Sequence, residues 1–173
     1  MKYGADCFER NYLELRRFPN ALCEWIRGKF IVCELETKSP VSQNKYKLCI
    51  NYEKGWTPAF WIIEPNLLVG KVIHTFHGCS NKLCLFKTSN WRWTDSCNIV
   101  DTMLLWAFMW IVYYEDFCKT GKWMGVEATH NLQPKDDNDQ AIPKVSKRKP
   151  SFLKKSPVRL VELEKYMQKG KRK

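Results

Sequence analysis

The densest group of side chains that could do chemistry lies between residues 74 and 87. This stretch reads HTFHGCSNKLCLFK and holds two histidines, two cysteines, one asparagine and two lysines. It has little helical or strand periodicity, which is typical of a functional loop on a rigid scaffold. A cysteine nucleophile is the first interpretation. Cys84 is the candidate, because Leu83 and Leu85 would anchor the backbone while the thiol faces a groove.

A nucleophilic cysteine needs supporting groups. Thiolate is the reactive form, and it is favoured by an electropositive, partly exposed setting; His74, His77, Lys82 and Lys87 would supply one. Acyl transfer also needs a group that stabilises the oxyanion. The candidates for that role are His74, His77, Asn81 and backbone N–H groups.

Two other interpretations of the same residues stay open. In the first, His74, His77, Cys79 and Cys84 bind zinc, because all four are zinc-ligand types. No C-x-x-C pair is present, so the spacing is not that of a common structural zinc site. In the second, the cysteines are buried, inert and structural. That interpretation is preferred for the six cysteines outside the loop: Cys7, Cys23, Cys33, Cys49, Cys97 and Cys118.

The eight cysteines are expected to be free thiols in a reducing, cytoplasmic compartment, because no apolar leader precedes them. The longest apolar run, Met103 to Tyr114, has twelve residues. A transmembrane helix needs about 20, so this run predicts a buried helix and no membrane association.

Charge divides the chain into two parts. The net charge is +11, and residues 144–173 hold twelve Lys/Arg against two acids, which leaves the rest nearly neutral. We expect a folded domain over residues 1–131 and a polar linker with a basic, disordered tail over 132–173. Such a tail attracts nucleic acid or acidic partners without specificity, or it only keeps the chain in solution.

The periodicity of apolar residues predicts an α+β fold. An amphipathic helix is followed by a four-stranded antiparallel meander with short connections, an irregular segment and a long buried helix. The predicted elements are a helix over 5–18, strands over 22–26, 30–35, 46–52 and 59–63, the irregular segment 71–93 and a helix over 98–119. Asp95, Ser96 or Asn98 would cap the last helix, and Gly121 would end it.

This layout resembles the ubiquitin-conjugating fold. That family shows a histidine ten residues before its catalytic cysteine, then Cys-Leu and a tryptophan soon after. Here His74 precedes Cys84, Leu85 follows it, and Trp91 and Trp93 come next. The family's His-Pro-Asn signature reads His74-Thr75-Phe76 in this chain, so the oxyanion role of its asparagine does not carry over.

The bacterial branch of the family is more similar still. Over residues 5–130 the chain resembles the conjugating-enzyme-like proteins of CBASS antiphage operons. The residues that carry this resemblance are Pro58, Glu64-Pro65-Asn66-Leu67, His74, Phe76, Leu83-Cys84-Leu85-Phe86, Tyr114-Glu115 and a Thr-Gly-x-Trp-x-Gly end at residues 120–125, followed by Glu127 and His130. We expect no fused activating domain, as in the short type II systems that this chain resembles.

The resemblance implies a function. Cys84 would form a thioester with the C-terminus of a partner cGAS-like nucleotidyltransferase and pass it to an amine, which primes cyclic-oligonucleotide signalling. His74 and His77 would assist Cys84, while Asn81, Trp91 and Trp93 would support the loop. No cofactor is implied, the acceptor is unidentified and a homodimer is allowed. The alternatives are a non-catalytic interaction module and a zinc-stabilised nucleic-acid-binding protein.

Overall fold

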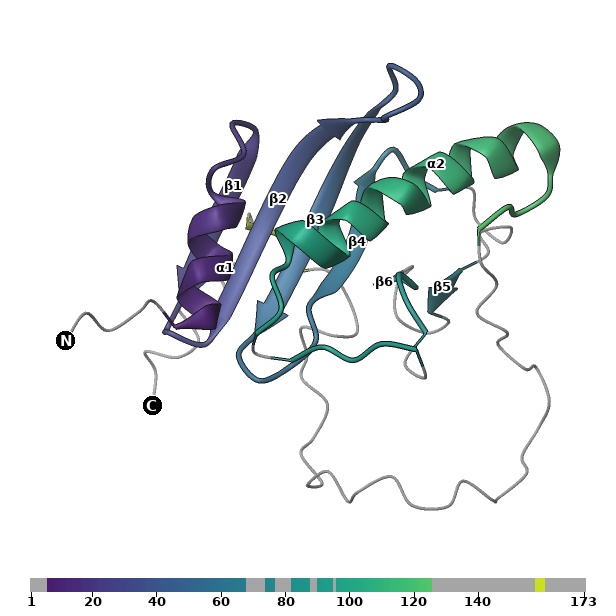
Figure 1. Cartoon of the computed structure of the whole chain (residues 1–173). Coiled ribbons are helices and arrows are strands. Elements are labelled where there is room, and N and C mark those ends of the chain that lie inside the picture. Colours follow the sequence, from purple (N-terminus) through teal and green to yellow (C-terminus); the bar gives the residue numbers. More distant parts are fainter. Residues whose placement is uncertain are drawn as a thin grey trace.

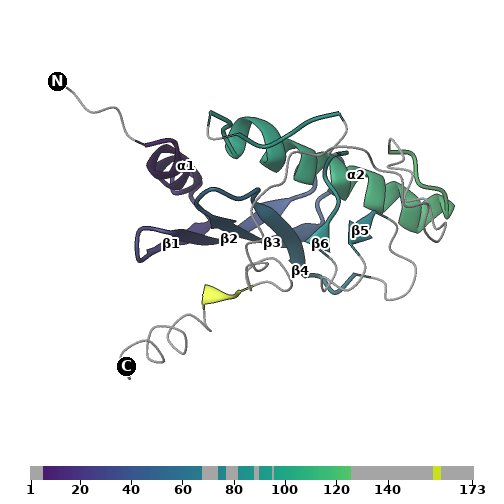
Figure 2. The same ribbon diagram turned by 90° about the horizontal axis from the view of Figure 1, so that it is seen from below.

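The described residues form a four-stranded antiparallel sheet with the helices on one face, and a second, two-stranded sheet (Figures 1 and 2). The computed structural model describes residues 6–67, 74–76, 82–87, 90–94, 96–125 and 158–160. The elements are α1 (Cys7–Leu15), β1 (Ala21–Ile26), β2 (Phe30–Lys38), β3 (Lys45–Glu53), β4 (Ala59–Glu64), β5 (Thr75–Phe76), β6 (Lys82–Leu83), the π-helix η1 (Val100–Leu104) and α2 (Leu105–Thr120). The predicted α+β class and four-stranded meander are confirmed.

A tight turn sets the register of β1 and β2. Arg27 and Gly28 both have positive φ, 49° and 66°, and the N–H of Lys29 donates to the carbonyl of Ile26. Two successive residues with positive φ match the right-handed twist of the flanking strands, and glycine adopts such a φ without steric cost. The turn therefore pairs Ile26 with Phe30 and fixes every later pair along the hairpin.

That register corrects the prediction for two cysteines. Cys23 lies opposite Cys33, and the two are joined by a disulfide. The sequence predicted eight free thiols from the lack of an apolar leader. The prediction is wrong for this pair, because the hairpin brings the two side chains together on one face of the sheet.

The two faces of the sheet differ in what covers them. One face packs against the helices, and the predicted alternation of β3 is confirmed there: Tyr46, Leu48, Ile50 and Tyr52 all belong to the main core. The opposite face carries other buried residues of the strands, among them Val32, Glu34, Cys49, Asn51 and Trp61. Both faces of the sheet are therefore buried.

The long helix begins with a π turn. Asn98 caps it, since its Oδ1 accepts the N–H of Val100 at 2.8 Å. The N–H of Leu104 then donates five residues back to Ile99 at 2.8 Å, and regular α-helix follows to Gly121, whose φ of 71° ends it as predicted. The π turn places Ile99 and Leu104 on the same buried side. None of the helices within the described residues is long and apolar enough to cross a bilayer.

A buried carboxylate ties α2 to the loop between β2 and β3. Glu115, 5% exposed, accepts hydrogen bonds from Ser39 Oγ at 2.8 Å, Ser42 Oγ at 2.8 Å, Asn44 Nδ2 at 2.9 Å and Tyr46 Oη at 3.0 Å. Burial acts to raise the pKa of Glu115, but these four donors outweigh it and the pKa is lowered. We call Glu115 and its four donors the Glu115 clamp.

Candidate active site

Cys84 follows directly after a short hairpin. In this hairpin β5 pairs with β6, Thr75 opposite Leu83 and Phe76 opposite Lys82, and β6 packs against β4 at the edge of the main sheet. Leu83 is buried in the main core and Leu85 packs against it. The cysteine therefore leaves a strand whose position is set by the core.

A backbone hydrogen bond joins the ends of this segment. The N–H of Cys84 donates to the carbonyl of His74 at 2.9 Å, and the indole Nε1–H of Trp110 donates to the same carbonyl at 3.1 Å. His74 has a φ of 63°, a region that histidine enters more readily than most residues. The carbonyl of His74 thus links Cys84 to α2.

The ring of His74 is held from the other side by the end of the domain. It stacks on Trp123 with centroids 4.7 Å apart and an interplanar angle of 21°. Trp123 in turn packs near Trp110, with ring centroids 5.6 Å apart. A Cβ on Gly125 would lie 2.6 Å from Trp123 Nε1, so only glycine fits there without a shift. The Thr-Gly-x-Trp-x-Gly end therefore holds His74, and through it Cys84.

The thiol of Cys84 is shielded. The residue is 9% exposed, and its Sγ lies 4.0 Å from the carbonyl oxygen of Phe86. Burial raises the pKa of the Cys84 thiol, and the charge of Lys82 only partly opposes this effect. The partly exposed, thiolate-favouring setting expected from the sequence is not what the structure shows, because desolvation outweighs the nearby cation.

Aromatic side chains surround the chain after Cys84. Phe86 and Trp91 pack edge to face at 4.7 Å, and Trp91 packs in the same way against Trp106 of α2 at 4.8 Å. Trp93 is 8% exposed and lies edge to face with Tyr52 of β3 at 5.4 Å. Both tryptophans thus fix the return of the loop from Cys84 to α2.

A cavity of about 280 Å³ adjoins the segment that contains Cys84. Its lining comes from both sides of the cysteine, from the start of β4 and the two residues before it, and from η1. The lining residues are Thr57, Pro58, Ala59, Phe60, Phe76, Lys82, Leu83, Leu85, Phe86 and Met103. The Nζ of Lys82 lies 4.2 Å from the centroid of the Phe76 ring. The cavity is mainly apolar with one cation in its wall.

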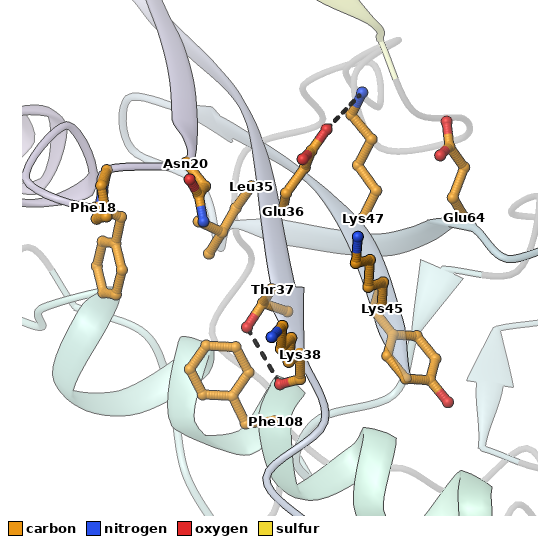
Figure 3. A pocket seen from close by; sticks show the side chains of 12 residues that line it. Phe18, Asn20, Leu35, Glu36, Thr37, Lys38, Lys45, Lys47, Glu64 and Phe108 are labelled. Carbon is orange, nitrogen blue, oxygen red and sulfur yellow. Dashed lines mark hydrogen bonds and ion pairs between the residues drawn. The ribbon is translucent and has the colours of Figure 1, made fainter. Parts of the chain in front are cut away.

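A larger hollow of about 670 Å³ lies where the ends of β2, β3 and β4 meet the segment before β1 and Phe108 of α2 (Figure 3). Three lysines, Lys38, Lys45 and Lys47, stand in its wall together with Glu36. Neither Cys84 nor any described residue of the β5–β6 hairpin lines it, so it is not part of the cysteine site.

The zinc hypothesis concerns His74, His77, Cys79 and Cys84. His77, Cys79 and Asn81 lie outside the described residues. In the part of the chain that is described, no group of three or more His, Cys, Asp or Glu residues is placed to bind a metal. The two described members of the predicted set, His74 and Cys84, are joined through the backbone of His74.

Two residues that position the site, Trp110 and Gly125, were not identified from the sequence. Trp110 was interpreted only as part of a buried helix, and the hydrogen bond from its indole to His74 has no signature in the periodicity. Gly125 was noted only as part of a family motif, because the close approach of Trp123 that requires a glycine there depends on tertiary packing.

The raised pKa of Cys84 leads to a testable expectation. At pH 7 iodoacetamide is expected to modify exposed Cys118 well before Cys84, and the rate at Cys84 should keep rising above pH 9. The reason is that only thiolate reacts, and burial disfavours the thiolate of Cys84. Timed labelling from pH 7 to 10 with peptide mass spectrometry measures both rates in one sample. Equal rates for the two thiols at pH 7 would contradict this assignment.

Comparison with known proteins gives the family. A search of curated proteins found no match. A family model described as Type II CBASS E2 protein matches residues 11–131, which include the sheet, the β5–β6 hairpin with Cys84, and the Trp123–Gly125 end that holds His74. The match covers well over half of the chain, and the chain therefore belongs to the family of E2-like proteins of type II CBASS antiviral defence.

Proposed function

We propose that this protein is a conjugating enzyme with a ubiquitin-conjugating fold, acting in the cytoplasm, whose Cys84 forms a thioester with the C-terminus of a partner cGAS-like nucleotidyltransferase. The acyl group is then passed to an amine, which primes the cyclase. One observation carries the proposal: Cys84 is fixed between Leu83 and Leu85, which pack in the main core, and its N–H donates to His74. Leu83 and Leu85, though not Cys84 itself, also line the cavity of about 280 Å³, where we place the end of the donor peptide. Membership of the type II CBASS E2 family agrees with it.

The reaction is covalent catalysis in two steps. In the first, Cys84 Sγ attacks the carbonyl carbon of an activated acyl donor, either an acyl adenylate or another thioester. The donor's activating group leaves with the electron pair and takes up the proton of the thiol. In the second, an amine nitrogen attacks the same carbonyl, an amide forms, and the sulfur departs and regains a proton.

The buried state of Cys84 suits such a transfer. A shielded thiol with a raised pKa reacts slowly with small electrophiles and oxidants. We expect the thiol to react once an acyl donor lies against it, because the negative charge then passes to the donor's departing group.

The test is co-expression with the proposed cGAS-like nucleotidyltransferase partner, followed by intact mass spectrometry with and without a thiol reductant. Wild type is expected to give a mass equal to both chains less one water, and reductant should cleave it. Cys84→Ala should lose the adduct, and Cys84→Ser should give an ester that survives reductant but not hydroxylamine. Cys118→Ala is the matched control, since this exposed thiol is expected to be dispensable.

The same experiment distinguishes the non-catalytic alternative. If wild type and Cys84→Ala both give only the two free chains and still bind each other, the protein is an interaction module and the thioester proposal is wrong. An adduct that persists in Cys84→Ala but disappears in Cys118→Ala would move the chemistry to another thiol.

A further inference from the structure

Three residues of the basic tail lie on the face of the sheet opposite to α1 and α2. Figure 2 shows residues 158–160, in yellow, on that side of the strands. The first of them, Val158, is 3% exposed. The sequence predicted a solvated tail because of its charge, and most of it lies outside the described residues. These three residues, however, pack against the sheet.

Asn51 in the middle of β3 recognises the backbone of this segment. Its Oδ1 accepts the N–H of Val158 at 2.9 Å, and its Nδ2 donates to the carbonyl of Val158 at 3.2 Å. Cys49 Sγ lies 3.5 Å from the same carbonyl. The amide of Asn51 thus pairs with Val158 as a neighbouring strand would. Asn51 is 2% exposed, so without the segment its amide would lose both of these partners inside the protein.

Glu34 of β2 recognises the next two residues. Its Oε1 accepts Arg159 Nε at 2.7 Å and its Oε2 accepts Arg159 Nη2 at 3.3 Å, a two-point contact. Oε1 also accepts the N–H of Leu160 at 3.1 Å. Burial acts to raise the pKa of Glu34, yet these contacts and Lys47 outweigh it and the pKa is lowered. The carboxylate is therefore charged and matched to an arginine.

Apolar contacts complete the site. Val158 packs on Val32 of β2, and Ile26, Phe30 and Leu160 lie against the same cluster. A charged, an amide and an apolar side chain of β2 and β3 thus each contact a different part of residues 158–160. Val32 is paired with Asn51, and Glu34 with Cys49, in the sheet, so the rigid register of β2 and β3 fixes the site before any peptide arrives.

We infer that this face of the sheet is a binding site for a peptide of the form aliphatic–Arg–aliphatic, and that the protein's own Val158-Arg159-Leu160 occupies it. Asn51 hydrogen-bonds the peptide backbone, Glu34 binds the arginine, and the apolar cluster around Val32 packs against the aliphatic side chains. Because the segment belongs to the same chain, its effective concentration at the site is high, on the order of mM. The site is therefore filled in the resting protein.

Occupancy is tested by amide hydrogen exchange in the full chain, measured by NMR. The N–H groups of Val158 and Leu160 are expected to exchange at least about tenfold more slowly than in a synthetic peptide of residues 154–164. Arg159→Ala should remove most of this protection, and it cannot damage the sheet. Glu34→Gln should do the same. Glu36→Gln is the matched control, since Glu36 also pairs with Lys47 but makes no contact with residues 158–160.

Recognition is tested by adding the labelled synthetic peptide to full-length Arg159→Ala, whose own tail competes poorly. Binding with a Kd below about 1 mM is expected, and Asn51→Asp in that background should weaken it at least about tenfold, because a carboxylate cannot donate to the carbonyl. Wild type should bind the peptide more weakly than Arg159→Ala does. The inference would be overturned if the amides of Val158 and Leu160 exchange in wild type as fast as in the free peptide. It would also be overturned if Asn51→Asp leaves peptide binding unchanged.

Discussion

Trp123→Ala is expected to lower the free energy of unfolding by about 2–4 kcal/mol and to abolish formation of the Cys84 adduct. The indole contacts the rings of His74, Trp110, Tyr113 and Phe117, so its loss leaves a cavity at the end of α2. It also removes the ring that holds His74, whose carbonyl fixes the backbone of Cys84. Urea unfolding and the intact-mass assay measure the two effects separately.

Gly125 offers a subtler version of the same experiment. A methyl group there would lie 2.6 Å from Trp123 Nε1 and 2.8 Å from Tyr113 Cδ2, so Gly125→Ala should push Trp123 away from His74 without removing it. Met124→Ala is the matched control, because Met124 is 69% exposed. Full adduct formation in Gly125→Ala and Trp123→Ala would show that Cys84 does not depend on this packing.

Glu115→Ala is expected to cost about 3 kcal/mol of unfolding free energy. The substitution leaves four donors of the Glu115 clamp without their acceptor, and two of these, from Ser39 and Tyr46, belong to buried residues. Burial, and then the hydrogen bond to Glu115, raise the pKa of Tyr46, so its hydroxyl stays a donor. Asp116→Ala, at the next position, makes none of these hydrogen bonds and is the control.

The effect of Glu115→Ala should depend on pH. The folded pKa of Glu115 is lowered, so the clamp contributes its full stability above the unfolded value of about 4.3. This stability is lost as pH falls through the folded pKa, and the difference between wild type and variant should shrink below about pH 4. Thermal unfolding at pH 7 and at pH 3 measures the difference. A difference that is independent of pH would mean that the charge of Glu115 contributes nothing.

The sequence was sufficient for the elements that depend on local pattern. The alternation from Tyr46 to Tyr52 placed four apolar residues on one face of a strand, and the structure shows all four in the main core. Of the three cap candidates, Asn98 bonds the first turn of the long helix, and Gly121 ends that helix as predicted. Local chemistry decides these features, since a strand period, a capping side chain and a left-handed glycine act within a few residues.

Features that join distant segments were not predicted. Three such features join residues that are far apart in the chain: the Glu115 clamp, the hydrogen bond from Trp110 to His74, and the contact between Val158 and Asn51. Cys23 and Cys33 are a different case. They lie on neighbouring strands of one hairpin, but the prediction of free thiols rested on the expected compartment alone and did not consider the register of these strands.

The hydrogen bond between His74 and Cys84 has a consequence for how the loop can vary in evolution. Residues 77–81 are flanked on both sides by paired residues. Thr75 pairs with Leu83, Phe76 pairs with Lys82, and the N–H of Cys84 donates to His74, so the base of the loop is closed. Lengthening a loop that is already closed at its base costs little, about 0.6 kcal/mol for each doubling. Insertions at its tip would therefore leave the cysteine in place, so that the loop can diversify against changing partners or phage countermeasures while the reactive centre stays constant.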